Sequence, residues 1–275
     1  MIPDLILLRG GGDLASGIAL RLHRVGLKLA ISELPQPLAV RRAVCFSEAV
    51  YTGAHTVEKI TARLTDQDGV DHPLRAGEIP ILIDPDASIL TVEPHRWSVV
   101  IDARMLKRAP APLPIDVPLH IGLGPGFHAG RNCHAVIETR RSHTLGRVFW
   151  EGAPQPDSRT PDGDPRRVLR APVAGEVWGR SNIGDRVRTG QVVAEIRAED
   201  RSPRLVVTAL SGVLRGLIHE GIIVPENTKI GDVDPRNDAA ACFLVSDKAL
   251  AVAGGVLEAV FSFDKHHTMG RSPRP

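Results

Sequence analysis

A glycine-rich turn and an acidic residue downstream of it have the types and spacing needed to bind a dinucleotide. Gly10, Gly12 and Ala15 fit the pattern G-x-G-x-x-A. Glycines lack Cβ atoms, so backbone amides can approach a phosphate, and the helix expected after the turn adds partial positive charge at its N-terminus. Glu33 lies 21 positions after Gly12, where an acidic residue would meet a ribose diol.

Charged residues around this turn leave its interpretation open. Asp13 would repel a diphosphate, and its alternative role is to cap the helix that begins there. Arg41 and its neighbour Arg42 could meet a 2′-phosphate or another ligand phosphate, or could lie on the wet face of a short helix. The turn is therefore either a nucleotide site or an α/β connection that binds no ligand.

A second glycine loop occupies residues 122–130 and contains three glycines at alternate positions around Pro125. Such a loop can present backbone amides to an anion, and acidic, guanidinium and imidazole side chains follow it closely. Active sites use such mixtures of titratable groups. The predicted cofactor-binding residues are Gly10, Gly12, Asp13, Ala15, Glu33, Arg41, Gly124, Gly126 and His128. The predicted catalytic residues are Glu138, Arg140 and His143.

Alternating apolar runs and helical stretches over residues 1–150 predict a Rossmann-like domain of the α/β class with a parallel sheet. The runs expected to be strands are Leu5–Leu8, Leu27–Ile31, Ile79–Ile83, Ser98–Ile101, Leu119–Leu123 and Ala135–Ile137. A helix is expected to begin near Asp13, and Gly17 would let it lie close to the sheet. Asp84 and Asp102 each follow a strand directly, so each either faces a ligand or caps the next turn.

A proline-rich linker, residues 151–167, separates this domain from a segment with an internal repeat, residues 168–236. Pro172–Ile196 aligns with Ala209–Val233 without a gap at an offset of 37 residues. The repeat predicts two copies of one β unit around a shared core, and it resembles a biotinyl/lipoyl-type barrel-sandwich. The hairpin between the halves has no lysine, which disfavours a carrier and favours a structural or docking role.

The C-terminal segment is expected to be a helix that returns to the first domain, over residues 237–262, followed by a disordered tail over residues 263–275. Ser246 is the expected N-cap. Gly254 and Gly255 weaken the helix unless another backbone packs closely against them. Asp232 and Asp234 could bind a cation, but a turn is favoured and no metal site is predicted.

Composition excludes several classes of function. There are 34 Lys and Arg residues against 32 Asp and Glu, a balance that leaves no electrostatic footprint for nucleic acid. Aromatic residues make up 4% of the chain, too few for a platform that stacks single-stranded bases. We find no apolar window long enough for a membrane span and no secretory signal. The three cysteines have no CxxC spacing, which fits a reducing cytoplasm.

Three stretches together resemble the selenium-dependent molybdenum hydroxylase system accessory family, a group of molybdenum cofactor biosynthesis or maturation proteins. They are Arg9–Gly17, Gly122–Val148, and a third stretch in two pieces, Lys229–Arg236 and Ser246–Ala259. The Rossmann part of that family is similar to the xanthine dehydrogenase accessory factors. The resemblance implies a pathway rather than a reaction, and Ser142 departs from the glycine expected in its turn.

Three functions remain open at this point. The resemblance implies a maturation factor that binds a pterin dinucleotide (molybdenum cofactor) or another nucleotide and acts on a molybdenum hydroxylase apoprotein. An NAD(P)-dependent oxidoreductase is the first alternative, with His128 or His143 as general acid or base. A non-catalytic scaffold is the second. A homo-oligomer is also expected, whereas nucleic acid and membrane partners are not.

Overall fold

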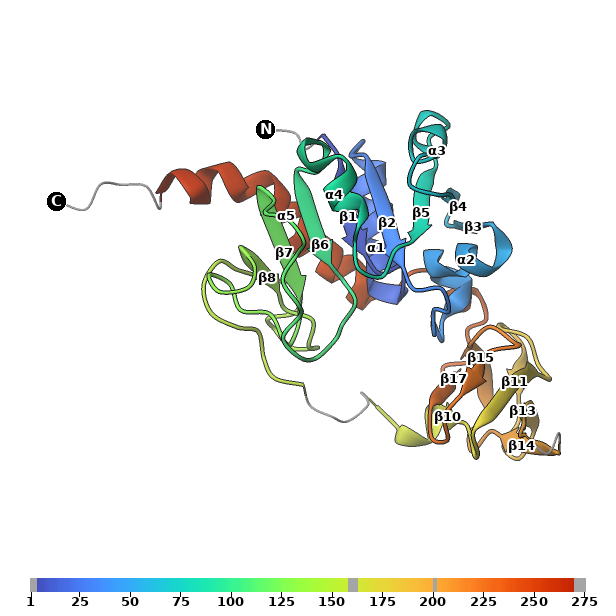
Figure 1. The fold of residues 1–275 in the computed structure, drawn as a ribbon. Coiled ribbons are helices and arrows are strands. Elements are labelled where there is room, and N and C mark those ends of the chain that lie inside the picture. The colour runs from blue at the N-terminus through green and yellow to red at the C-terminus, as the bar shows by residue number, and fades with distance from the viewer. Residues whose placement is uncertain (1–3, 158–162, 200–201, 270–275) are drawn as a thin grey trace.

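The computed structural model describes residues 4–157, 163–199 and 202–269. The chain forms a large sheet with helices against it and a smaller unit of two short sheets (Figure 1). Two main apolar cores correspond to these parts. The larger core lies between the large sheet, α1 (Asp13–Arg24) and α5 (Asp247–Met269). The other lies inside the smaller unit.

The large sheet has nine strands in the order β3-β4-β5-β2-β1-β6-β7-β8-β9. The strands from β4 to β8 run parallel, whereas the edge strands β3 and β9 run antiparallel to their neighbours. Their bounds are β1 Ile6–Arg9, β2 Leu29–Glu33, β3 Ala54–Val57, β4 Ile60–Leu64, β5 Ile79–Ile83, β6 Val99–Asp102, β7 Leu119–Leu123, β8 Ala135–Ile137 and β9 Val148–Phe149. All six predicted strands are confirmed, with ends displaced by at most two residues.

Helices α1 and α5 lie side by side and cover one face of this sheet. A Cβ atom at Gly17 would lie 2.7 Å from the Cβ of Ala249. Gly17 therefore allows α1 to approach α5, and the expectation that it serves contact with the sheet is wrong. Shorter helical segments are α2 Ala49–Thr52, α3 Asp71–Arg75, α4 Ile89–Val92, and the 3-10 turns Arg42–Val44, Phe46–Glu48, Pro94–Arg96, Pro165–Arg167 and Ala240–Phe243.

The smaller unit consists of two four-stranded antiparallel sheets, ordered β10-β17-β15-β12 and β14-β13-β11-β16. The strand bounds are β10 Val168–Arg170, β11 Gly175–Gly179, β12 Arg186–Val187, β13 Val192–Arg197, β14 Pro203–Val207, β15 Gly212–Leu217, β16 Ile223–Val224 and β17 Lys229–Asp234. The predicted repeat is confirmed, because β11, β12 and β13 recur as β15, β16 and β17. Each sheet contains strands from both copies, so neither copy buries its apolar side chains alone.

The smaller unit packs against the segment between β2 and α2 of the large one. The rings of Tyr51 and His219 stack with centroids 4.1 Å apart. The Nδ1 atom of His219 lies 2.8 Å from a carboxylate oxygen of Glu48, and the Nε of Arg42 donates to the carbonyl of Leu217 at 3.1 Å. These contacts hold the two parts together. The predicted domain boundaries and the linker 151–167 stay a prediction.

Helix α5 begins where expected, because the Oγ of Ser246 accepts a hydrogen bond from the amide of Ala249. A Cβ atom at Gly255 would overlap the carbonyl of Gly146, so this glycine allows the close backbone contact anticipated from the sequence. The helix continues to Met269, so the prediction of a disordered tail is wrong from Phe263 to that residue. Residues 270–275 lie outside the described part of the chain.

By length and composition, Ala240–Phe263 is a candidate membrane span within the described residues. By this criterion, the expectation that no window is long and apolar enough for a membrane span is wrong. The stretch includes most of α5, whose inward side chains are buried against α1 and the large sheet. A core helix of a soluble fold passes the same test, so this candidate is weak evidence for a membrane.

The predicted fold class, a Rossmann-like parallel-sheet domain followed by a biotinyl/lipoyl-like barrel-sandwich and a helix, is wrong as stated. The large sheet is mixed, since β3 and β9 are antiparallel. The connections from β6 to β7 and from β7 to β8 contain no helix, although a doubly wound sheet needs one there. The architecture is a mixed nine-stranded sheet, two small antiparallel sheets and a C-terminal helix.

Candidate functional site

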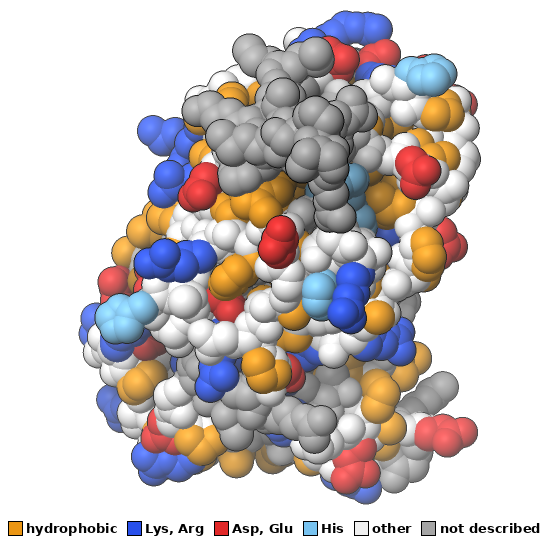
Figure 2. Space-filling model, turned by 90° about the vertical axis from the view of Figure 1, so that its left-hand side faces the viewer, with side chains coloured by type: hydrophobic (Ala, Val, Ile, Leu, Met, Phe, Trp, Pro, Cys, Tyr) orange, Lys and Arg blue, Asp and Glu red, His pale blue; other side chains and the backbone are white. Residues whose placement is uncertain are grey.

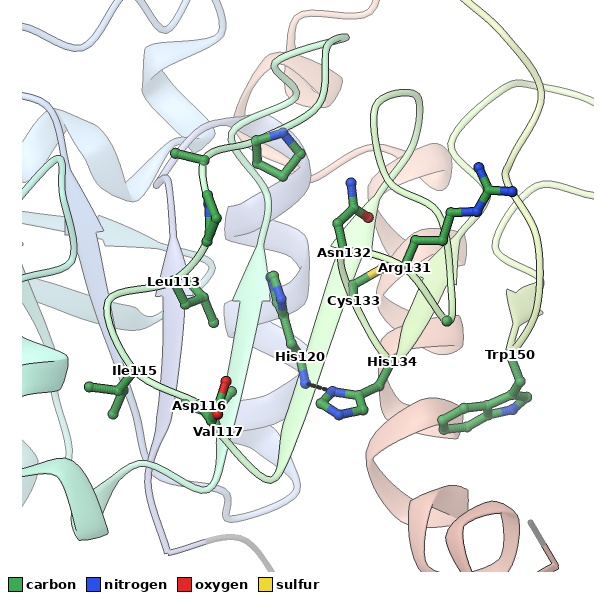
Figure 3. Close-up of a pocket in the computed structure, with 14 residues that line it drawn as sticks. Leu113, Ile115, Asp116, Val117, His120, Arg131, Asn132, Cys133, His134 and Trp150 are labelled. Carbon is green, nitrogen blue, oxygen red and sulfur yellow. Dashed lines mark hydrogen bonds between the residues drawn. The ribbon is translucent and has the colours of Figure 1, made fainter.

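A cavity of about 570 Å³ lies beside β7 and β8. One wall is the segment 110–117, which leads into β7, and the other is the segment 130–134, which leads into β8 (Figure 3). Successive strand residues point to opposite faces of a sheet. Leu119 and Ile121 join the core under α5, so His120 between them points to the other face, where this cavity lies.

The imidazole of His120 is the most constrained polar group of this cavity. The residue is 8% exposed, and its Nε2 atom has no hydrogen-bond partner among the described residues. Burial lowers the pKa of His120 to about 4, against a weaker opposing effect of Asp102. The side chain is therefore a neutral imidazole at physiological pH. The ring of Phe127 meets it edge-on, with centroids 6.0 Å apart.

His134 holds the two strands in register at the cavity. Its Nδ1 atom accepts a hydrogen bond from the backbone amide of His120 at 2.9 Å, as the dashed line in Figure 3 marks. Because Nδ1 is the acceptor, the proton of neutral His134 lies on Nε2. The structure therefore fixes the tautomer of this second imidazole.

Cys133 contributes a protonated thiol. Burial raises the pKa of this thiol to about 12. A nucleophilic cysteine needs a thiolate, which forms beside cations or at helix N-termini. Cys133 therefore lines the cavity as a small apolar group.

The rest of the lining is mixed, with apolar side chains and two exposed charged ones, Asp116 and Arg131. Leu113, Ile115 and Val117 stand on one wall, and Trp150 lies beyond His134 (Figure 3). The amide of Asn132 is committed to its own loop, since it donates to the carbonyl of Gly126 and accepts from the amide of His128. The cavity can therefore hold an apolar molecule with a polar atom directed at His120.

Both aspartates that follow strands serve the fold. Asp84 accepts hydrogen bonds from the amides of Ser88 and Ile89, at 2.8 and 3.0 Å, so it caps the turn that starts α4. Asp102 is fully buried and binds the guanidinium of Arg104 through both oxygens. The capping alternative is confirmed for Asp84, and Asp102 is an ion-pair acceptor.

In the first glycine turn, the side chain of Glu33, the residue predicted to bind a ribose, accepts hydrogen bonds from the backbone. Glu33 accepts from the amide of Gly11 at 3.3 Å and from the amide of Leu34 at 2.6 Å. Burial raises the pKa of this carboxyl group. Gly10 has a φ of +94°, which explains the glycine there. Gly12 precedes α1, and a Cβ atom there would meet nothing within 4 Å.

Asp13 and Arg41 are brought together, although 28 residues separate them. Both oxygens of Asp13 accept from one guanidinium nitrogen of Arg41, at 2.9 and 3.1 Å. The other nitrogen donates to the carbonyls of Ala241 and Leu244. Asp13 makes no side-chain cap of α1, so it acts here as the partner of a buried arginine. Ala15 lies in the core.

The second glycine loop needs its glycines for close contacts within the chain. Gly124 and Gly126 have φ values of +67° and +105°. A Cβ atom at Gly124 would overlap the hydroxyl of Thr139, and one at Gly126 would overlap the backbone of Arg108. The Nδ1 of His128 lies 2.9 Å from the carbonyl of Ala129. Both loop glycines therefore have a structural reason that involves no ligand.

The three predicted catalytic residues do not converge. Glu138 is fully buried and accepts from the amides of Arg140 and Gln155, at 2.7 and 2.8 Å. Arg140 and His143 are exposed. None of the three lines the cavity beside β7. Their catalytic role, like the cofactor-binding role of the nine other residues, stays a prediction.

Sequence reasoning missed His120, His134 and Trp150. The available signal was a histidine inside the otherwise apolar run Leu119–Leu123, where a buried imidazole needs a reason. The segment 110–117 showed no pattern from which a cavity wall could be predicted. Among the described residues, no group of three or more His, Cys, Asp or Glu side chains could hold a metal ion.

No family model matches the chain. The Escherichia coli (strain K12) protein named Uncharacterized protein YqeB is 41% identical to it over 262 residues. The match covers 94% of this chain and 47% of that protein, so the chain spans about half the length of the curated relative it matches.

Similar solved structures include an aspartoacylase family protein from Mesorhizobium loti, at 13% identity over 85% of each chain with a TM-score of 0.30. A succinylglutamate desuccinylase/aspartoacylase from Rhodobacter sphaeroides has 15% identity and a TM-score of 0.27, over 83% of this chain and 85% of the other. The ectoine utilization protein EutE from Ruegeria pomeroyi has 9% identity and a TM-score of 0.26, over 83% and 85%. Likenesses this distant assign no activity.

The expected resemblance to the molybdenum hydroxylase accessory family is wrong: no family model matches the chain, and the curated relative is the Uncharacterized protein YqeB. The function drawn from it, a maturation factor in selenium and molybdenum cofactor biosynthesis, is wrong with it, as are its two alternatives, the NAD(P)-dependent oxidoreductase and the scaffold. The glycine loops that suggested nucleotide binding are occupied by contacts within the chain. The predicted cofactors and partners stay predictions.

Proposed function

We propose that this chain binds a small organic molecule in the cavity between segments 110–117 and 130–134, with a polar atom of the ligand hydrogen-bonded to Nε2 of His120. The observation that carries the proposal is the buried, unpartnered Nε2 of that imidazole. A buried polar atom left without a partner costs about 1–3 kcal/mol. A ligand that supplies the missing partner recovers this energy.

The size and lining of the cavity suit such a ligand. Its volume of about 570 Å³ lies within the range of about 300–1,000 Å³ found for small-molecule sites. Such sites combine apolar walls with a few placed polar groups. Here Leu113, Ile115 and Val117 supply apolar contact, and Trp150 offers a ring surface.

The charge state of His120 defines the ligand further. Since its pKa is lowered to about 4, the neutral imidazole gives one hydrogen bond and carries no charge to hold an anion. A carbonyl, an amide or a ring nitrogen on a flat apolar body is the chemistry that fits. The protonated thiol of Cys133 adds no nucleophile.

The test uses benzamide and toluene, which share a ring but differ in the polar group. Trp150 lines the cavity, so its fluorescence reports binding. We expect benzamide to quench it saturably and to bind more tightly than toluene. In His120→Leu the preference for benzamide should fall by about 10-fold, the equivalent of ~1.4 kcal/mol for one lost hydrogen bond.

His143→Gln is the matched control, because His143 is exposed and lies outside the cavity lining. It should retain the preference for benzamide. An equal preference in wild type and His120→Leu, or no saturable quenching by either probe, would contradict the proposal.

We also propose a cytoplasmic location. All three cysteines, Cys45, Cys133 and Cys242, are free thiols and buried. Proteins of reducing compartments keep their thiols in this state. Recovery of the tagged protein in an osmotic-shock fraction, apart from a cytoplasmic marker, would contradict this location.

A further inference from the structure

A second, charged cleft lies between the two parts of the molecule. It has a volume of about 230 Å³ and lies apart from the cavity beside β7. Side chains from α1 and from the segment after β2 form one side of it, and side chains from β15 and β17 form the other. Its charged residues are Asp13, Arg41, Arg167, Arg215, Lys229 and Asp232.

Two of its four cations are fully paired. Arg41 binds Asp13 at 2.9 Å. Arg167 binds both oxygens of Asp232, at 2.9 and 2.7 Å. These pairs use up both carboxylates that line the cleft.

The other two cations, Arg215 and Lys229, share carboxylates that other arginines already bind. Arg215 lies 3.8 Å from Asp232 and 3.6 Å from Asp234, and it makes no hydrogen bond to any residue in the described part of the chain. Lys229 lies 3.9 Å from Asp232. Asp234 itself binds Arg236 through both oxygens.

The cleft is consequently electropositive. Burial lowers the pKa of Arg215 and of Lys229; nearby cations act in the same direction, and Asp232 opposes them. The side chain of Arg215 is 15% exposed, so its donors are held near the cleft with little access to bulk water. Guanidinium groups in this state bind oxyanions through paired hydrogen bonds.

The N-terminus of α1 adds to this field. The helix has 12 residues, and no side chain caps its first turn. Asp13, its first residue, lines the cleft. Aligned peptide dipoles place partial positive charge at this end.

We propose that this cleft binds a doubly charged oxyanion of phosphate type, held by Arg215 and Lys229 beside the N-terminus of α1. Two positive charges in excess of the lining carboxylates match a phosphate dianion. Both sides of the cleft contact it, so the anion ties the smaller unit to the large sheet. This site is independent of the His120 cavity and of its proposed ligand.

Two measurements test it on the whole chain. Isothermal titration with inorganic phosphate, at constant ionic strength set by sodium chloride, should show saturable binding. Thermal unfolding should shift upward with phosphate but not with added chloride. Phenyl phosphate then distinguishes the source of the anion: tighter binding than inorganic phosphate assigns the cleft to a phosphomonoester, and weaker binding assigns it to the free ion.

Arg215→Gln and Lys229→Met should each weaken phosphate binding by about 10-fold or more, since each removes one charge-assisted contact. Two separate variants are used so that a folding defect in one, seen by circular dichroism, does not decide the test. Arg188→Gln, a change at an exposed cation of the same unit, should bind phosphate as wild type does. No binding of either phosphate, or equal loss in Arg188→Gln, would overturn the proposal.

Discussion

The His120 cavity and the charged cleft, the two proposed ligand sites, bury polar groups in opposite ways. Beside β7, the imidazole of His120 is kept neutral by burial, and its Nε2 atom has no hydrogen-bond partner in the described part of the chain. Between the two parts of the molecule, four cationic side chains line a cleft with two carboxylates. The first arrangement favours an uncharged ligand, whereas the second favours an anion. For one isolated base, losing its proton on burial costs less free energy than staying charged. Where several charged side chains are buried together, each needs a partner of opposite charge.

The contrast is local, because the whole chain carries nearly balanced charge, with 34 Lys and Arg residues against 32 Asp and Glu. Figure 2 shows Lys and Arg side chains interspersed with Asp and Glu over one face of the molecule. Selectivity for an anion thus depends on the arrangement inside the charged cleft.

The largest effect is expected on breaking a pair in the charged cleft. Arg41→Leu leaves Asp13 without its cation and leaves two backbone carbonyls without a donor. Loss of one partner of a buried pair costs about 3–5 kcal/mol, and the side chain of Asp13 is 33% exposed, so we expect a decrease at the low end, about 3 kcal/mol, in the free energy of unfolding. Urea denaturation measures it. Arg188→Leu, at an exposed position, should change stability by less than ~0.5 kcal/mol.

The neutral imidazole predicts a pH dependence of stability. His120 has a pKa of about 4 in the folded chain, below its usual value of 6.5. Between these two pH values the unfolded chain binds the proton more readily, so stability falls as the pH is lowered through this window. The contribution is about 3 kcal/mol.

Urea denaturation at pH 7 and pH 4, in wild type and His120→Leu, isolates this contribution. The variant should lose less stability over the window by that amount. The same pH dependence in both proteins would show that His120 is not the neutral group that the cavity requires.

A smaller effect on stability is expected in the second glycine loop, residues 122–130, which borders the cavity beside β7. Gly124→Ala places a methyl group against Thr139 at a φ of +67° and should cost about 2 kcal/mol. Gly130→Ala is the control, since its φ is +81° but no atom lies within 4 Å of the added Cβ. It should cost about 1 kcal/mol. Equal costs in the two variants, measured by thermal unfolding, would remove the steric reason for Gly124.

The sequence predicted the strands and helices better than the functional residues. Strand runs such as Ile79–Ile83 and the helix that begins at Asp13 follow from local apolar periodicity, and the repeat follows from matched glycines and apolar residues. The direction of β3 and β9 does not, because an edge strand of two to four residues pairs either way with little local difference. The continuation of α5 beyond Phe263 does not follow from the sequence, because the polar residues there interrupt the apolar periodicity of the helix.

The candidate sites depend on contacts between distant segments, which composition does not reveal. The sequence predicted separate ligand-binding roles for Asp13 and Arg41, and Arg215 and Lys229 come from another part of the chain. Glu138 looked catalytic because acids near glycine loops often are, but its carboxylate binds two backbone amides. His120 was overlooked because it lies within an apolar run.

The most direct test of the central claim is an NMR titration of the histidine side chains with benzamide, with His120 assigned by comparison with His120→Leu. We predict a saturable shift of the Nε2 resonance of His120, while the resonances of exposed His143 stay unchanged. A fixed His120 resonance at saturating benzamide would contradict the assignment of this cavity as the ligand site.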